Sequence, residues 1–170
     1  MFIGFAQLNA TVTPIPVIRN TAGSPVEPSA TPTYRVYGPS GLMTGGTGSL
    51  AKLDTGTLTG ATNASPIVIT STAHGLNTGV KITITGVTGN TAANDTYTVT
   101  VVNANSFSLD GSTGNGTYVS GGTWNVTGLY SATITASGVN GYEIGETYAI
   151  LVSAQISGVG WGETFEFTVT

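Results

Sequence analysis

Short segments with strict alternation of apolar and polar residues dominate this chain. In TYAILVSAQI (147–156) every second residue from Tyr148 onward is apolar, and in ETFEFTVT (163–170) two Phe and a Val alternate with polar residues. Side chains two positions apart lie on the same face of a β-strand, so each segment predicts a strand with one buried face. No segment shows the period of an amphipathic helix. The sequence therefore predicts an all-β protein.

The other alternating segments fall into an outer set and a middle set. Gly, Pro and Asn residues separate them at intervals of about ten residues, which is typical of a β-sandwich or a β-barrel. The outer set adds TYRVYGP (33–39) and GLYSATITAS (128–137). The middle set, in which Thr takes most outward positions, comprises PIVIT (66–70), KITITGV (81–87), TYTVTVV (96–102), SFSLD (106–110), TYVS (117–120) and TWNV (123–126).

The strand count indicates how the chain divides into domains. Residues 1–61 and 127–170 each supply about three strands, too few for a sandwich, whereas together they supply enough for one. We therefore predict a discontinuous β-sandwich into which a small β-domain, residues 62–126, is inserted at a loop. Two domains in succession are the alternative.

The composition narrows the possible partners. Only 7% of residues are charged, against about 25% in an average domain. The four cations are scattered along the chain, whereas a nucleic-acid interface needs clustered Lys and Arg, so we expect no nucleic-acid partner. We also expect no secretory signal and no membrane partner, since MFIGFAQLNATV (1–12) has no basic start and no run approaches the ~18 apolar residues of a spanning helix.

His74, the single histidine, lies in AHGLNTG (73–79). A catalytic His needs a nucleophile and an orienting carboxylate within hydrogen-bond reach, and a zinc site needs several further ligands. The chain has no second His, no Cys and no G-x-S-x-G motif. Because Gly75 and Gly79 supply positive φ angles, we expect His74 to fill or cap a turn rather than to act in catalysis.

The segment DGSTGNG (110–116) carries the oxygen donors Asp110, Ser112 and Asn115, as a calcium loop does. Calcium sites take six to eight oxygen ligands with several carboxylates, and only Asp110 is charged here. We expect a hairpin turn at the Asn-Gly pair 115–116 instead, and no metal.

Four glutamates near the end of the sequence could supply the acid and base of a glycosidase. Glu163 and Glu166 differ by an odd number of positions, so a regular strand directs them to opposite faces. Glu143 and Glu146 lie in a loop sequence. We expect all four to be solvated charges that limit aggregation, and we expect no catalytic residue and no cofactor.

Four aromatic residues are candidates for an interaction surface: Trp161, Trp124, Tyr142 and Tyr118. Their rings could stack against the apolar faces of a sugar. We place Trp124 in a strand and Trp161, within GVGWGE, at an exposed hairpin tip. Packing in the core or contact between subunits is the interpretation we favour, because Trp is common at protein interfaces.

The segment GSPVEPSATPT (23–33) is rich in proline. Proline favours an extended conformation, so the segment predicts a stiff edge or spacer. In one interpretation it lies across a neighbouring subunit. A surface loop is the alternative.

The middle segment carries four motifs that point to a known family: AHGLNTG (73–79), GVTGNTAAND (86–95), NANSFSLDGSTGNG (103–116) and GGTW (121–124). They resemble a small β-barrel repeat found in many phage tail and virion proteins. That repeat is described as similar to the FCCH domain of ubiquitin-activating enzymes. The resemblance implies that residues 62–126 form a small β-barrel.

The outer segments resemble the immunoglobulin-like domain of phage structural proteins. The motifs are PTYRVYGPSG (32–41), GLYSATITAS (128–137) and GETYAILVSAQISGV (145–159). In versions without an insert, the stretch near DTGTLTG runs almost directly into GLYSATI. The resemblance therefore implies an immunoglobulin-like β-sandwich that is discontinuous in sequence.

Together the two resemblances imply a bacteriophage virion structural protein without enzymatic activity. We expect capsid decoration or stabilisation, or head–tail joining, on the capsid surface rather than the tail. The expected partners are viral structural proteins, major capsid or head–tail proteins, with multiple copies per particle. One alternative is a tail-associated or surface-exposed adhesin that binds host glycan through Trp161 or Trp124. The other alternative is a glycan hydrolase.

Overall fold

The computed structural model describes all residues, 1–170, and consists of β-strands joined by turns, so the predicted all-β class is confirmed. The chain forms an outer unit, Met1–Lys52 with Gly128–Thr170, and a middle unit, Leu53–Thr127. The helical segments are two 3₁₀ turns, η1 (Thr91–Ala93) and η2 (Gly138–Asn140). Neither has the length or the apolar character that crossing a membrane requires.

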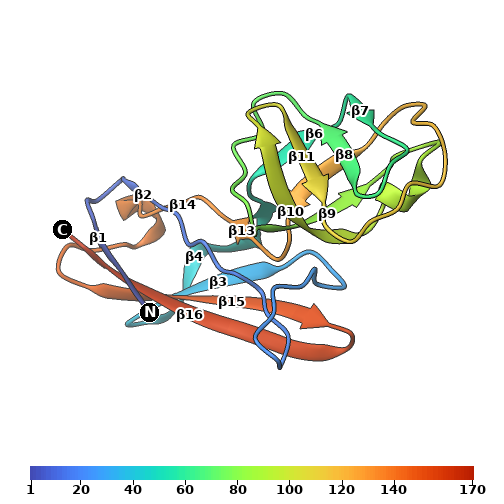
Figure 1. Ribbon diagram of the computed structural model, residues 1–170. Coiled ribbons are helices and arrows are strands. Elements are labelled where there is room, and N and C mark those ends of the chain that lie inside the picture. The colour runs from blue at the N-terminus through green and yellow to red at the C-terminus, as the bar shows by residue number, and fades with distance from the viewer. The chain divides into compact units, whose positions relative to one another are not determined.

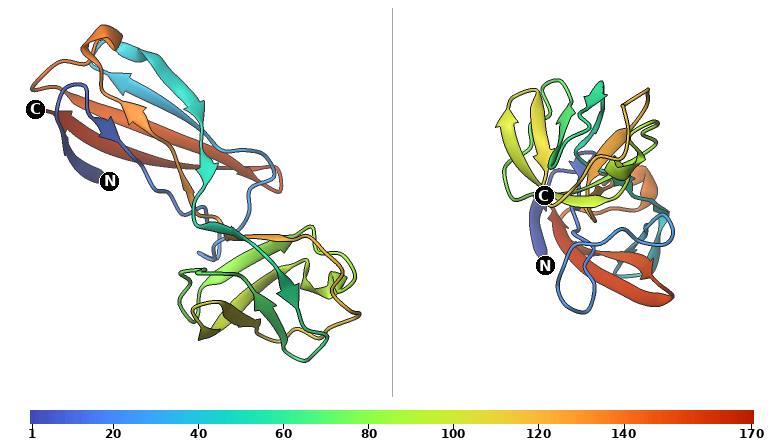
Figure 2. Two further views of the ribbon diagram at one scale, coloured as in Figure 1. Left: turned by 90° about the horizontal axis from the view of Figure 1, so that it is seen from above. Right: turned by 45° about the vertical axis from the view of Figure 1, so that its right-hand side comes forward.

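The main sheet of the outer unit has the order β1 (Phe2–Ala6), β16 (Val159–Val169), β15 (Thr147–Ile156), β3 (Thr33–Gly38) and β4 (Gly41–Ser49) (Figure 1). The long antiparallel hairpin of β15 and β16, orange to red in Figure 2, forms its centre, and β1 pairs with β16 in parallel. Two short ladders contribute to the same core: β2 (Thr11–Val12) with β14 (Ile134–Thr135), and β5 (Ala51–Lys52) with β13 (Tyr130–Ser131). These sheets are consistent with the predicted β-sandwich.

The alternating pattern accounts for the core of the outer unit. In β15 the predicted inward residues Tyr148, Ile150 and Val152 are buried, whereas the alternate residues Leu151 and Ser153 are exposed. Burying each such apolar side chain stabilises the fold by about 1.5–3 kcal/mol relative to leaving it in water. The second layer adds Ile18, Leu50, Tyr130, Ala132, Ile134 and Ala136 to this core.

The middle unit contains one curled sheet, in the order β6 (Thr55–Thr57), β12 (Thr123–Val126), β9 (Lys81–Thr85), β10 (Thr96–Asn103), β11 (Ser106–Leu109), β8 (Ile67–Thr70) and β7 (Gly60–Ala61). One stretch, 55–61, supplies both end strands. The Leu58 N–H donates to the Gly122 carbonyl, and the next N–H, of Thr59, donates to the Thr70 carbonyl. This stretch thus passes from β12 to β8. No ladder pairs β6 with β7 directly, and the barrel stays a prediction.

The core of the middle unit is made by the inward residues of these strands, among them Ile67, Ile69, Ile82, Ile84, Val99, Phe107, Leu109 and Trp124. The Trp124 ring meets Phe107 edge-on, with 6.3 Å between ring centroids. Its indole N–H donates to the Ser71 hydroxyl at 2.9 Å, and that hydroxyl donates to the Thr57 carbonyl. The polar end of the ring is therefore satisfied inside the core.

Two predicted strands differ in the structure. The segment TYVS (117–120) forms one isolated bridge, between Thr88 and Ser120, and no strand. GLYSATITAS (128–137) is divided into β13 and β14, which pair with different partners, although Tyr130, Ala132 and Ile134 share the buried side as predicted. In both cases local turns override the alternating pattern.

The middle unit begins earlier than the strand pattern indicates. The pattern places its start at residue 62, whereas in the structure the compact unit starts at Leu53. The reason is that Thr55, Gly56 and Thr57 pair with β12 and so belong to the middle sheet.

Candidate interaction surface

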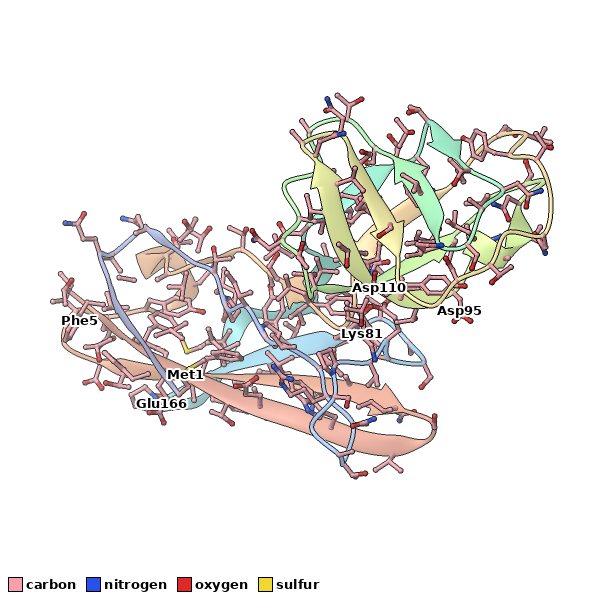
Figure 3. All side chains as sticks on the ribbon, in the orientation of Figure 1. Met1, Phe5, Lys81, Asp95, Asp110 and Glu166 are labelled. Atoms are coloured by element: carbon pink, nitrogen blue, oxygen red, sulfur yellow. The ribbon has the colours of Figure 1, made fainter.

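The first strand displays apolar side chains at an open edge of the outer sheet. β1 pairs with β16 on one side and has no neighbour on the other. Met1, Phe2 and Phe5 are exposed, Phe2 by 52% and Phe5 by 73%. Figure 3 shows Met1 beside Glu166 and Phe5 farther along the same strand; the Glu166 N–H donates to the Met1 carbonyl. We call Met1, Phe2 and Phe5, with the unpaired side of β1, the β1 edge.

A local irregularity brings the two Phe rings of the β1 edge together. Residues three positions apart point to opposite faces of a regular strand. Here the register with β16 shifts between Phe2 and Gly4, and Gly4 has a φ of 120°, which favours glycine. The Phe2 and Phe5 rings pack edge-to-face, with 5.4 Å between centroids. The sequence pattern does not reveal this pair, because its spacing conflicts with simple alternation.

The opposite edge of the sheet has a different surface. β4 contains four glycines and no charged residue, and Leu42 is its exposed large apolar side chain. Open strand edges without charge or proline can pair with other chains. The main sheet of the outer unit thus has two open edges, of which only the β1 edge carries aromatic residues.

Two of the four predicted interaction residues lie in the cores. Trp124 and Tyr142 are each 3% exposed. Tyr142 packs on Tyr148, with 4.7 Å between ring centroids, and burial raises its pKa to about 12. Both side chains therefore stabilise the interior. This corrects their assignment to a surface, and the reason is that their strands or loops turn them inward.

Tyr118 and Trp161 are the two that keep exposed atoms. Tyr118 is half-buried, and its hydroxyl donates to the Gly121 carbonyl at 3.0 Å, which fixes the loop before β12. Trp161 lies within β16, opposite Ala154, whereas the hairpin tip is formed by Ser157 and Gly158. The predicted tip position of Trp161 is therefore wrong. Its ring is half-buried at the end of the outer core.

His74 has a structural environment. The side chain is 8% exposed, and its ring meets Phe107 edge-on. Its Nδ1 accepts the Leu76 N–H at 3.0 Å, so its Nε2 carries the hydrogen and donates to the Asn103 carbonyl at 2.9 Å. Both ring nitrogens are used in holding the turn, as the sequence predicts.

Asparagine side chains hold the other motif loops in the same way. Asn90 is fully buried; its amide nitrogen donates to the Thr62 carbonyl, and its amide oxygen accepts the Asn115 N–H. The Asn115 side chain in turn accepts the Ala92 N–H. The Asn-Gly pair at 115–116 therefore anchors a long loop and does not form the predicted hairpin.

The acidic residues do not converge. No group of three or more His, Asp or Glu side chains is placed to hold a metal ion. The pairing of β16 with β15 has no irregularity, so Glu163 lies on the core side of β16, where it is half-buried, and Glu166 lies on the outer side. Glu143 and Glu146 line a shallow hollow beside η2. Asp110 is exposed in the loop after β11.

The proline-rich segment contributes a half-buried anchor, Glu27, that the sequence does not reveal. The Glu27 carboxylate accepts the Gly128 N–H and the Tyr130 hydroxyl, each at 2.9 Å, and pairs with the Lys52 ammonium at 3.1 Å. Burial opposes the charge, but these donors outweigh it and lower the pKa of Glu27. Burial and the Glu27 charge raise the pKa of Tyr130. The segment is a surface loop of this unit, also bonded through Ser29 to Gln155.

Comparison with known proteins bears on the middle unit. Residues 65–127 match the family described as the ubiquitin-activating enzyme E1 FCCH domain. The middle unit is FCCH-like. The match spans less than half of the chain. The four motifs of this unit supply the His and Asn anchors described above, so they mark its fold.

The comparisons over the whole chain give less information. No curated protein matches its sequence. Among solved structures it is similar to a family 123 glycoside hydrolase from Clostridium perfringens, with 10% identity and a TM-score of 0.24, over 98% of this chain and 22% of that chain. The chain thus spans about a fifth of that hydrolase, and a likeness of this size supports no conclusion about fold or activity.

Proposed function

We propose that this chain is a non-enzymatic structural protein of a bacteriophage virion. It decorates or stabilises the capsid, or joins head and tail, through contacts with other virion proteins, and we favour the capsid surface. The β1 edge is the observation that carries the proposal, because it combines the open side of an edge strand with exposed Met1, Phe2 and Phe5. The resemblance of the middle and outer segments to parts of phage structural proteins is the reason that we propose a virion as the assembly to which the chain binds.

The chemistry of the β1 edge suits addition of a strand from a partner. An extended segment of the partner forms main-chain hydrogen bonds with the open side of β1. Pockets on the partner's surface receive the two Phe rings. Aromatic residues are enriched among those that contribute most to binding. Transfer of the exposed Phe pair out of water lowers the free energy of the system. Binding of a partner over the β1 edge is therefore favourable.

The sparse surface charge favours repeated docking. The net charge is −4, with 7% charged residues, so copies that assemble side by side repel one another weakly. On a symmetric particle, repeated contacts add through multivalency. A modest interface per copy is then sufficient for stable decoration.

Co-sedimentation with phage particles tests the proposal. The particles are those released by the host strain that encodes the chain, stripped of this protein and then mixed with purified variants. We expect the double variant Phe2→Ser, Phe5→Ser to bind about tenfold more weakly or worse, as loss of a binding hot spot predicts. Leu42→Ser, which removes an exposed apolar side chain from the opposite edge, is the matched control and should bind normally.

Circular dichroism establishes that each variant is folded before binding is compared. Mass spectrometry of purified particles provides the independent check. If the particles lack this chain, the virion assignment is wrong. If the double variant binds as well as Leu42→Ser, the virion role can stand but the β1 edge is not the docking surface.

A further inference from the structure

Trp161 forms a wall shared by three hollows of the outer unit. The first, about 480 Å³, lies between Trp161 and the loop that begins at Arg19. The second, about 450 Å³, extends toward Ile15 and Glu163, and the third, about 520 Å³, extends toward Thr31 and Gln155. Each volume is in the range of sites that hold a small ligand. We call the first of these the Trp161 hollow.

The Trp161 hollow has one apolar wall and one polar wall. The hairpin of β15 and β16 supplies Ile156, Val159 and Trp161, and the loop supplies Arg19, Asn20 and Thr21. At Gly160 a Cβ would meet nothing within 4 Å, so no side chain fills the space between the walls there. A ligand with an apolar face and a polar rim fits this arrangement.

The polar wall is held in place before any ligand binds. The Asn20 side-chain oxygen accepts the N–H groups of Ala22 and Ser24, each at 3.0 Å. The Arg19 guanidinium donates to the Gly23 carbonyl at 2.8 Å, which orients it. A preorganised loop loses little conformational freedom on binding, and this favours affinity.

Arg19 is a cation without an acidic partner. The one ion pair of the structure joins Lys52 and Glu27, and Arg19 is the only charged residue that lines the Trp161 hollow. A guanidinium with donors left over matches a carboxylate, which it can bind through two parallel hydrogen bonds. Arg19 also lines the second hollow, where Glu163 faces the same space, whereas no acidic residue lines the first. An anionic group is therefore favoured in the first hollow.

We propose that the Trp161 hollow binds a carboxylate-bearing sugar residue. The C–H face of the sugar ring packs on the Trp161 indole, its carboxylate pairs with Arg19, and its hydroxyls bond to Asn20 and Thr21. The two adjoining hollows accept neighbouring sugars, so an acidic oligosaccharide binds more tightly than the single sugar. The proposal rests on the glycan-binding alternative and is independent of docking through the β1 edge.

Binding of a defined acidic oligosaccharide tests the site. The probes are a glucuronate-containing tetrasaccharide, its methyl ester and the corresponding neutral glucose tetrasaccharide, titrated into the full chain by calorimetry. We expect the acid to bind at least about tenfold more tightly than the ester or the neutral form, as expected for a hydrogen-bonded charge pair. The affinity of the acid should fall as salt is added.

Variants locate the binding. In Arg19→Gln, the affinity for the acidic tetrasaccharide should fall to the affinity for its methyl ester. Arg35 is an exposed arginine of β3 that lines none of the three hollows. Arg35→Gln should therefore leave both affinities unchanged. Trp161→Ala should weaken binding of the acidic tetrasaccharide and of its ester alike by about tenfold, as loss of an aromatic contact predicts. Because Trp161 also packs on the core, Trp161→Phe is included and should retain part of the affinity.

The outcomes are separable. No heat with any saccharide, or equal binding by Arg19→Gln and the unchanged chain, overturns the proposal. A peptide with a free C-terminal carboxylate that binds where the saccharides do not also overturns it, and identifies a protein occupant instead. None of these results bears on the particle-binding test of the β1 edge.

Discussion

At the scale of single residues, buried and half-buried polar side chains hold the loops of both units. Glu27 is the clearest case, because it receives donors from three positions distant in sequence, Lys52, Gly128 and Tyr130. Each hydrogen bond to a charged group contributes about 1.5–3 kcal/mol to stability. Lys52 and Gly128 are also the residues at which the outer unit ends and resumes. Glu27 therefore fixes both strands that lead to the middle unit.

This arrangement predicts an acid-sensitive contribution to stability. The pKa of Glu27 in the folded chain lies below its ordinary value of 4.5, so the carboxylate stabilises the fold above that pH and loses this contribution as the pH falls through the lowered pKa. Glu27→Gln should lower the free energy of unfolding by about 1–3 kcal/mol at neutral pH and flatten its decline below pH 4.5.

Urea unfolding between pH 3 and pH 7, in buffers of equal ionic strength, measures the effect of the substitution. Glu166→Gln, at an exposed position on the outer face of β16, is the control and should keep the pH profile of the unchanged chain. A Glu27→Gln profile with the same slope as the control would show that the carboxylate makes no net contribution.

At the scale of elements, alternation predicted most of the strands and missed those that are very short or rich in glycine, the nine-residue β4 among them. The inward and outward sides of β15 follow directly from TYAILVSAQI (147–156). β6 and β7, within 55–61, were not predicted, because TGTLTGA is too short and too rich in glycine to show an alternation of apolar and polar residues. TYVS (117–120) has the pattern of a strand, but the Tyr118 hydroxyl and the Asn115 side chain hold this part of the chain in a loop.

The candidate surfaces show the same limit. The Phe2–Phe5 pair depends on a register shift at Gly4, and a shift of this kind follows from pairing with β16, which pattern alone does not specify. The Trp161 hollow depends on a loop 140 positions away, at Thr21. Long-range contacts of this kind are set by the fold, so a single sequence indicates the residues but not their neighbours.

Close packing of β6 on Trp124 predicts a sharp cost for one added methyl group. A Cβ at Gly56 would lie 2.6 Å from three atoms of the Trp124 ring. Gly56→Ala should therefore destabilise the middle unit by about 1–3 kcal/mol, as overpacking of a core does. Thermal unfolding followed by Trp fluorescence measures this.

Gly160→Ala serves as the control, because an added Cβ there meets nothing within 4 Å and its φ is ordinary. This variant should unfold at the temperature of the unchanged chain. Equal stability of the two alanine variants would mean that β6 moves away from the ring at little cost.

At the scale of the whole molecule, the chain has two hydrophobic cores, one in each unit. Each core includes or contacts one of the two tryptophans, Trp124 in the middle unit and Trp161 in the outer unit. Separate cores indicate that each unit has its own source of stability. Intrinsic fluorescence can therefore report the two units independently in variants that retain a single tryptophan.

We predict that the outer unit folds without the middle unit. In a variant in which a short Gly-Ser linker replaces Leu53–Thr127, Trp161 is the remaining tryptophan, and its fluorescence should show one cooperative unfolding transition. The reason is that Lys52 and Tyr130 are already partners in the β5–β13 ladder, so the linker spans neighbouring strands. A broad, non-cooperative transition would show that the outer unit needs the middle unit to fold.

The β5–β13 ladder has a practical consequence. Since Lys52 pairs with Tyr130, the two positions at which the outer unit ends and resumes, Lys52 and Gly128, lie close together. A foreign domain can therefore be inserted between them. A reporter enzyme or an epitope domain whose own termini lie next to each other can be grafted there with little extra entropy of loop closure. Such chimaeras would carry their cargo wherever the outer unit itself docks.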